Sequence, residues 1–277
     1  MIFDPIVDAL LIAIALCLAW IFSLLRVIDR TENGKKELEQ SKTEFVSLAS
    51  HQLGTPATAI KWYTELLLDP KNLYSEAKNH YGAAIYEANQ RMIELIDSLL
   101  NVSRIEVGRL AIKPGFVDIV DLSKKVAEEM RPLAVAKQVS ISWHVTNPIP
   151  IMTIDPQLLR IVVQNLLSNA IKYTLREGKI TVSIYSKNSK VYLSVADSGI
   201  GIPTKDQHRI FDKMYRAGNA LKQTADGSGL GLYLVKSVVG LLGGSITFES
   251  AETVGTTFYV ILPLKNNEHM EGNLLKQ

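Results

Sequence analysis

The sequence predicts an α+β protein with three parts: an N-terminal transmembrane helix, a hairpin that pairs with a second copy into a dimeric four-helix bundle, and an α/β sandwich domain. Three observations predict this fold class. An apolar run occupies residues 6–25, helical periodicity continues to about residue 106, and strand patterns alternate with helical patterns after Gly108. The 277 residues leave room for about two folded domains.

The composition is that of a folded globular protein. Hydrophobic residues make up 47% of the chain and charged residues 21%, which excludes a mainly disordered chain. The net charge of +2 gives no reason to expect nucleic-acid binding, although a small acidic or nucleotide ligand remains open. The single cysteine, Cys17, excludes an internal disulfide and a cysteine-based zinc site.

The first predicted element is a transmembrane helix at residues 6–25, where Asp8 and Ser23 are the polar side chains. Twenty helical residues span about 30 Å, the thickness of a bilayer core. A cleaved signal peptide is the alternative, but the first residues carry no Lys or Arg and no small-residue cleavage site precedes the basic stretch. Four basic residues follow the run and place the rest of the chain in the cytoplasm: Arg26, Arg30, Lys35 and Lys36.

A linker helix at residues 26–40 and a helical hairpin at residues 41–110 are expected next. Apolar residues at steps of three, four and seven predict one stripe on each helix of the hairpin. A polar turn at residues 69–72 separates the two helices. A lone hairpin buries little surface, so pairing into a homodimeric four-helix bundle is expected. The stripes are Phe45, Ala49, Leu53, Ile60, Tyr63 and Leu67, then Ile85, Ala88, Met92, Leu95, Leu99 and Val102.

Residues 111–264 are predicted to form the α/β sandwich domain, followed by a loose tail at residues 265–277. Alternating or apolar runs predict the strands, and longer runs with helical spacing predict the helices. Glycines at residues 243–244 would end the second helix, and Gly255 lies in a turn between the last two strands. Strands are expected at residues 139–145, 179–185, 190–196, 245–250 and 256–262, and helices at residues 155–172 and 230–242.

The first hairpin helix contains a candidate reactive histidine. At about 100° per residue, His51 lies about 150° from the centre of the apolar stripe and should face solvent. Thr55 shares its face, and Pro56 should bend the helix there. The segment from residue 45 to residue 56 resembles the H-box of two-component sensor histidine kinases, in which a phosphoaccepting His precedes Leu, Thr and Pro at these spacings.

The H-box departs from the family pattern at two positions. The residue after the His is usually Glu or Asp, which acts as general base, and the residue before the Thr is usually Arg; here they are Gln52 and Gly54. Gln52 can orient His51 by a hydrogen bond but cannot take its proton, so slow autophosphorylation is expected. The alternative is a phosphatase-biased or kinase-impaired signalling adaptor, because Thr55 matches the Thr that positions water for dephosphorylation in related enzymes.

The helix at residues 155–172 presents Asn165 and Asn169 together, at i and i+4, outside its apolar face. The segment from Asn165 to Tyr173 resembles the N-box of the kinases. The resemblance assigns Asn169 to Mg²⁺, Asn165 to its outer sphere or a catalytic water, Lys172 to phosphate and Tyr173 to the adenine face. Carboxamide oxygens suit Mg²⁺, a hard cation that also needs nucleotide oxygens and waters.

Asp197 continues the core-facing alternation of the strand at residues 190–196, directly before a glycine turn. A buried carboxylate needs a hydrogen-bond donor, and the exocyclic amine of adenine would supply one. This segment resembles the G1 box of ATP-binding domains related to histidine kinases, gyrase and Hsp90. Gly199 and Gly201 would let the backbone approach the base.

The third glycine cluster, Gly227, Gly229 and Gly231, opens a predicted helix whose free N–H groups can meet phosphate. The polar stretch at residues 217–226 is expected to form a mobile lid over the nucleotide. Residues 210–216 resemble the F-box, which places Lys213 or Arg216 near the terminal phosphate. Residues 255–258 resemble the family's late Gly-Thr turn, with Thr257 at the ATP site.

These motifs occur in family order between residues 41 and 264, and no Walker A loop is present. The resemblance implies a membrane-anchored kinase that uses ATP and Mg²⁺, phosphorylates His51 and passes the phosphoryl group to an aspartate of a cognate response regulator. The other implied partners are a second copy of the chain, membrane lipid and a membrane sensor protein, with no nucleic acid. A third alternative, an Hsp90-like or MutL-like ATPase, shares the nucleotide fold but gives the hairpin no role.

Overall fold

The computed structural model describes residues 47, 49–50, 52–68, 75–107, 112–146, 148–224 and 227–264. The predicted transmembrane helix, the linker helix, His51 and the predicted tail lie outside the described residues. Within those ranges, no helix has the length and apolar character that crossing a bilayer requires. The chain divides into two compact units, residues 1–55 and 56–277, and the described positions of the first are helical.

The predicted helical hairpin is present in the described residues. Residues 52–68 form one helix and α2, Ser75–Glu106, forms the other. The ring of Tyr63 lies 6.0 Å from that of Tyr81 and 6.3 Å from that of His80. Because these residues lie at similar distances along the chain from the intervening turn, their contact requires the two helices to run antiparallel.

Two apolar seams run along α2. The predicted stripe is largely covered within the chain itself, since its members at steps of seven, Ala88, Leu95 and Val102, are all buried. A second apolar seam lies on a neighbouring face of the helix, where most of its residues precede the buried ones by two positions. This second seam is exposed to solvent. It consists of Tyr86, Ile93, Ile96, Leu100 and Val107.

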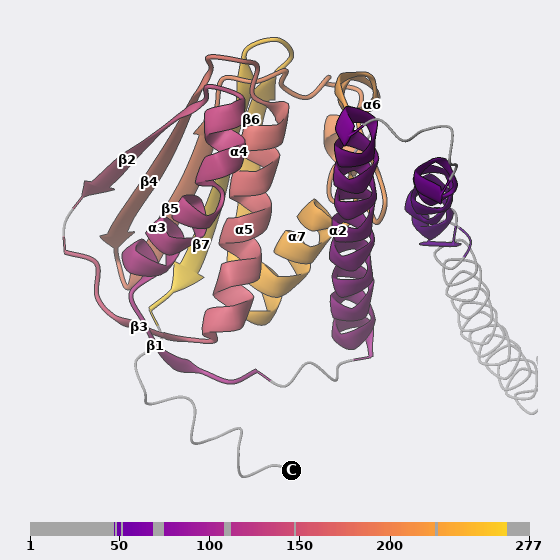
Figure 1. Ribbon diagram of the computed structural model, residues 1–277. Coiled ribbons are helices and arrows are strands. Elements are labelled where there is room, and N and C mark those ends of the chain that lie inside the picture. Colours follow the sequence, from indigo (N-terminus) through magenta and orange to yellow (C-terminus); the bar gives the residue numbers. More distant parts are fainter. Residues whose placement is uncertain are drawn as a thin grey trace, which may run out of the picture. The chain divides into compact units, whose positions relative to one another are not determined.

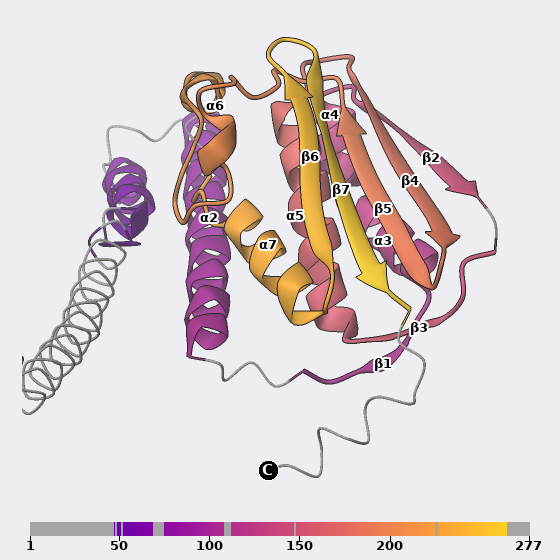
Figure 2. The ribbon, with the colours of Figure 1, turned by 180° about the vertical axis from the view of Figure 1, so that it is seen from behind.

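The α/β domain is a two-layer sandwich, as the sequence predicts. Its five-stranded sheet has the order β2-β4-β5-β7-β6, with β2 parallel to β4 and the other neighbours antiparallel. Helices α3, α5 and α7 cover one face (Figures 1 and 2). The strands are Ser140–Thr146, Lys179–Lys187, Lys190–Asp197, Ser245–Ala251 and Gly255–Pro263 for β2, β4, β5, β6 and β7. The helices are Ile119–Glu129, Pro156–Tyr173 and Gly231–Leu241 for α3, α5 and α7.

Several shorter elements were not predicted from the sequence. Strands of three residues and helices of six carry too few positions for a period to be visible. One of them changes the description of the predicted lid, because residues 217–226 include the helix α6. The elements are β1 Gly115–Val117, which pairs with β3 Met152–Ile154, together with α4 Arg131–Ala136, η2 Gln207–Arg209 and α6 Gly218–Gln223.

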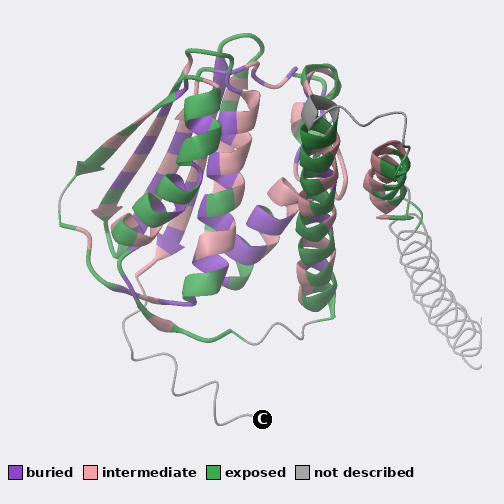
Figure 3. Ribbon diagram, in the orientation of Figure 1, coloured by how far each residue is buried: buried purple, intermediate pink, exposed green. Residues whose placement is uncertain are grey.

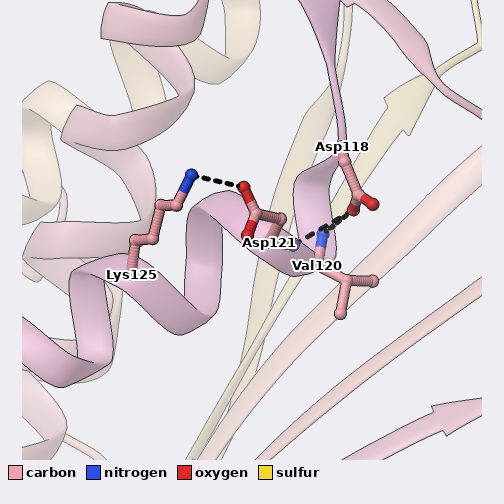
Figure 4. A network of polar contacts seen from close by, with 4 residues as sticks. All are labelled: Asp118, Val120, Asp121 and Lys125. Carbon is pink, nitrogen blue, oxygen red and sulfur yellow. Dashed lines mark hydrogen bonds and ion pairs between the residues drawn. The ribbon is translucent and has the colours of Figure 1, made fainter.

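The helix α3 was also missed, although its start carries a clear signal. Asp118 caps it, since its Oδ1 accepts hydrogen bonds from the backbone N of Val120 at 2.8 Å and of Asp121 at 3.1 Å (Figure 4). Asp121 and Lys125, one turn apart, form an ion pair at 2.8 Å. A capping aspartate of this kind stabilises a helix by about 1 kcal/mol.

The hydrophobic core lies between the sheet and its helices (Figure 3). Alternate residues of β4 and β5 are buried, as strand geometry requires, and the apolar stripe of α5 packs in the same core. Each fully buried Val, Leu or Ile side chain contributes roughly 1.5–3 kcal/mol. This burial fixes α5 on the sheet and so fixes the residues that α5 carries on its other side.

Candidate functional site

The C-terminal end of α5 is held by the ammonium group of Lys137. Its Nζ donates to the carbonyl oxygens of Ile171 at 3.0 Å, Lys172 at 2.6 Å and Thr174 at 3.0 Å. The last carbonyls of a helix lack intrahelical partners and favour a cation. Burial lowers the pKa of Lys137. This clamp fixes the segment that carries Lys172 and Tyr173.

The two predicted asparagines lie on the half-buried side of α5. Asn165 Nδ2 donates to the carbonyl of Ile161 at 2.8 Å, which leaves its Oδ1 for other contacts. That oxygen lies beside the first residue of α7, because a Cβ atom on Gly231 would come within 2.6 Å of it. Asn169 makes no hydrogen bond to another described residue, so its amide can serve a ligand.

Two cationic side chains meet at the loop that precedes α7. A Cβ atom on Gly227 would lie 2.6 Å from Lys172 Nζ and 3.7 Å from Arg216 Nε. Arg216 also donates to the carbonyl of Thr224 at 2.6 Å and so ties this site to the end of α6. Lys172, Arg216 and Gly227 come from separate segments of the chain and together form one positively charged cradle. Gly227 leaves room in it because it has no side chain.

The start of α7 borders this cradle. Its N-cap residue, Leu230, makes no side-chain capping bond, so the first backbone N–H groups of the helix lack such a partner. Gly229 has a φ of +70°, and a Cβ atom there would lie 2.5 Å from the backbone carbon of Met214. The glycine is therefore required both by its torsion angle and by the close approach of the F-box segment.

At the end of β5, Asp197 accepts two backbone hydrogen bonds. Its Oδ1 lies 2.9 Å from the N of Gly199 and 3.3 Å from the N of Thr256. Burial raises the pKa of Asp197 to about 6, and the two amides act in the opposite direction. Near neutral pH the carboxylate is therefore mostly ionised, and it can accept a further hydrogen bond from a ligand.

The glycine turn after Asp197 is held from three sides. Ile200 N donates to the carbonyl of Tyr173 at 3.2 Å, and Gly201, with a φ of +62°, lies against the backbone of Ala251. Asn219 of α6 donates to the carbonyl of Gly201 at 2.9 Å. Burial raises the pKa of the Tyr173 phenol, while Arg216, which hydrogen-bonds to it, lowers it. Tyr173, the glycine turn and α6 thus share one network.

Two further predicted site residues make contacts outside this cluster. Thr257 shares the alternation of Tyr259 on the face of β7 opposite the core, whereas the buried Thr256 pairs with Asp197. Thr256 is thus the residue of the Gly-Thr turn whose backbone N–H binds Asp197. Lys213 forms an ion pair with Glu106 at the end of α2.

The hairpin site is described only in part. Gln52 is half-buried and Thr55 is exposed, and both lie in the helix of residues 52–68. His51 lies outside the described residues, so the geometry around its ring is not part of the structure.

These groups together suit a nucleotide. Two cations and a helix N-terminus favour phosphate, a half-buried carboxylate favours an amine, and amide oxygens favour a hard cation. Among the described residues, no group of three His, Cys, Asp or Glu side chains could hold a metal ion. A magnesium ion held by Asn169 would therefore need further oxygens from the nucleotide and from water.

Two family models match the chain. The model for the His Kinase A (phospho-acceptor) domain matches residues 41–108, which include the hairpin helices. The model for the histidine kinase-, DNA gyrase B-, and HSP90-like ATPase matches residues 154–266, which include α5, Asp197, the glycine loop and β7. The boundary between the two matches agrees with the change from helical to mixed architecture.

Two known proteins with similar sequences are, by name, a histidine kinase and a sensor protein. The circadian input-output histidine kinase CikA of Synechococcus elongatus is 30% identical over 247 residues, which cover 86% of this chain and 33% of that protein. The alginate biosynthesis sensor protein KinB of Pseudomonas aeruginosa is 31% identical over 243 residues, which cover 87% of this chain and 40% of that protein. The chain thus spans between a third and two fifths of these relatives.

A solved structure supports the fold. Full-length ShkA in complex with AMPPNP superposes with a TM-score of 0.59 and 27% sequence identity, over 78% of this chain and 46% of that one. Similarity therefore extends across both the hairpin and the α/β domain.

Replacing Asp197 by Asn should stabilise the fold at pH 8 by about 1–3 kcal/mol and should have little effect at pH 4. The pKa of this carboxyl is about 6 in the folded chain against a usual 3.8, so the folded state binds the proton more tightly. Stability is therefore lost as pH rises from about 4 to about 6, when the buried group ionises. Urea unfolding of both proteins at the two pH values tests this, and equal destabilisation of the variant at both would contradict it.

Proposed function

The chain belongs to the sensor histidine kinases of two-component systems, and from this premise we propose that it transfers the γ-phosphoryl group of ATP to His51 and then to an aspartate of a cognate response regulator. The main support is the cradle in which Lys172, Arg216 and Gly227 meet beside the start of α7. Residues 41–110 would serve dimerisation and phosphotransfer, and residues 111–264 would bind ATP.

Asp197 and Tyr173 would bind the adenine base. The free acceptor capacity of the Asp197 carboxylate suits the exocyclic amine, and the two backbone amides that bind its Oδ1 keep it oriented. The carbonyl of Tyr173 accepts a hydrogen bond from Ile200 of the glycine turn, and its ring would pack on the face of the base. Gly199 and Gly201 bring backbone, without side chains, to the edge of this site.

Lys172, Arg216 and the amides at residues 227–231 would bind the phosphates. Phosphoryl transfer has a loose transition state in which charge spreads onto the transferred oxygens, so the protein contributes by positioning and charge compensation. Asn169 would hold the Mg²⁺, with Asn165 next to it, and the bound ion supplies further neutralisation of the phosphate oxygens. Closure of α6, which Arg216 already contacts, would exclude water.

At His51, a ring nitrogen would attack the γ-phosphorus. The step forms an N–P bond, breaks the bond to the bridging oxygen and leaves ADP, while the proton on the other ring nitrogen passes to solvent. Gln52 would orient the ring by a hydrogen bond but cannot accept this proton. The absent base accounts for the second candidate, a phosphatase-biased or kinase-impaired adaptor in which the exposed Thr55 positions water.

A membrane anchor at residues 6–25 is part of the proposal. It is supported by an apolar run of bilayer length with basic residues after it, and it would place the kinase part at the cytoplasmic face of the cell membrane. Input would then come from membrane lipid or a membrane sensor partner. Full extraction of the chain from membranes by alkaline carbonate, without detergent, would contradict the anchor.

Dimerisation is proposed from the open seam of α2, whose apolar residues recur at heptad steps and are exposed among the residues that the structure describes. Changing Ile93 and Leu100 together to Glu should shift the detergent-solubilised full chain from dimer to monomer mass in analytical ultracentrifugation. Glu94→Gln, exposed on the same helix about 100° around the helix axis from Ile93, is the control. A dimer that persists in the double variant would contradict this interface.

Incubation of the full chain with Mg²⁺ and γ-labelled ATP should give a label that is acid-labile and alkali-stable, as phosphohistidine is. His51→Gln should abolish the label while ATP affinity stays the same, because His51 is not among the residues proposed to bind the nucleotide. Label that persists in this variant would exclude His51 as the acceptor. Steady ATP turnover without a phosphoprotein would instead favour the Hsp90-like ATPase.

Replacing Gln52 by Glu should raise the initial rate of labelling at least about tenfold, since a working general base contributes about 10²- to 10⁴-fold. Gln52→Leu, which removes the hydrogen bond as well, is the matched comparison and should be slower than the native chain. If Glu and Gln give equal rates, a base is not the missing component and Gln52 suffices by orientation alone.

A further inference from the structure

Lys213 takes part in a cluster that joins three segments of the chain. Its ammonium forms an ion pair with the carboxylate of Glu106, the last residue of α2. The hydroxyl of Tyr233, in the first turn of α7, donates to the same carboxylate at 3.4 Å. Lys213 Nζ also lies 5.3 Å from the centre of the Tyr233 ring. The Glu106–Lys213–Tyr233 cluster therefore connects the hairpin helix to the F-box segment and to α7.

The cluster adjoins the phosphate cradle. Met214, next to Lys213, contacts Gly229 of the glycine loop, and Arg216 lies beside Gly227. The side chains of Lys213 and Glu106 are 29% and 33% exposed, so the pair is partly shielded from solvent. A displacement of Lys213 toward the cradle would break its ion pair with Glu106 of α2. One ammonium group cannot contact this carboxylate and a phosphate at another position at the same time.

We propose that Glu106 is a positioning residue that holds Lys213 on α2, and that the terminal phosphates of a bound nucleotide compete with Glu106 for this ammonium. The inference rests on the proposed function, since it needs ATP at the cradle. Carboxylate and phosphate are both anions that attract ammonium, and phosphate carries the higher charge. Binding of the terminal phosphates and release of the end of α2 are therefore coupled.

The coupling acts in both directions, as thermodynamic linkage requires. Without terminal phosphates, the end of α2 is tied to the F-box segment and to α7. With them, Lys213 leaves Glu106, and the hairpin helix loses an ionic contact to the ATP-binding domain. Since the hairpin carries His51, the phosphate occupancy of the cradle would govern how tightly the two parts of the kinase are joined.

The test is a double-mutant cycle on ATP and AMP affinity in the full chain, with Glu106→Gln, Lys213→Met and their combination. Glu106→Gln should tighten ATP binding about two- to fivefold, the range expected for a partly exposed ion pair, and should leave AMP binding unchanged. In the Lys213→Met background, Glu106→Gln should have no effect. Tyr233→Phe, which removes one hydroxyl only, should give a smaller change in the same direction.

Glu94→Gln, exposed on the same helix, is the matched control and should leave both affinities unchanged. Hydrogen exchange at residues 100–106 should speed up when ATP binds to the native chain, and should already be fast in Glu106→Gln. The proposal is overturned if Glu106→Gln weakens ATP binding, changes AMP binding equally, or acts unchanged without Lys213. A native chain that binds no ATP would instead reject the proposed function itself, whatever Glu106 does.

Discussion

The candidate site depends on one constraint, the fixed C-terminal end of α5. Lys137 binds three carbonyl oxygens there, and the carbonyl of Tyr173 receives the amide of Ile200 from the glycine turn. Burying an ammonium is costly, and its lowered pKa reflects that cost, but a ring of helix carbonyls offsets it. The apolar face of α5 prevents the helix from moving as a whole. The side chains proposed to bind phosphate and those proposed to bind the base are therefore held in place by one contact.

The regular part of the α/β domain could be predicted from the sequence because its strands are long enough to alternate. The two alternating strands β4 and β5 are joined by a two-residue turn. Asn188 and Ser189 have φ values of +51° and +55° there, as a tight hairpin needs. The pairing of β1 with β3 could not be predicted, because three residues show no period. The cover over the predicted stripe of α2 was equally hidden, since a periodic pattern shows which face is apolar but not what packs on it.

The site was predictable where its residues belong to short motifs. Lys172, Asn165 and the glycine loop come together as expected, because each motif fixes its residues to one helix end or one turn. Strand alternation places Thr256, and not Thr257, on the same buried face of β7 as Phe258. The sequence could therefore have indicated which threonine faces Asp197. The partner of Lys213 could not, because sequence spacing gives the position of a cation but not the anion that it reaches. Lys137 was missed for the same reason, since its ligands are main-chain oxygens of a distant segment.

The backbone of Met214 shows how the loop over the cradle is kept in place. Its φ of +57° lies in the left-handed region, which costs an L-residue about 1–2 kcal/mol. Local preference therefore opposes this conformation, and the close approach of Gly229 together with the ion pair of Lys213 must maintain it. Any rearrangement that separates these neighbours would release conformational free energy at one peptide unit. Met214 thus carries a local conformational strain, which the contacts of its neighbours offset in this structure.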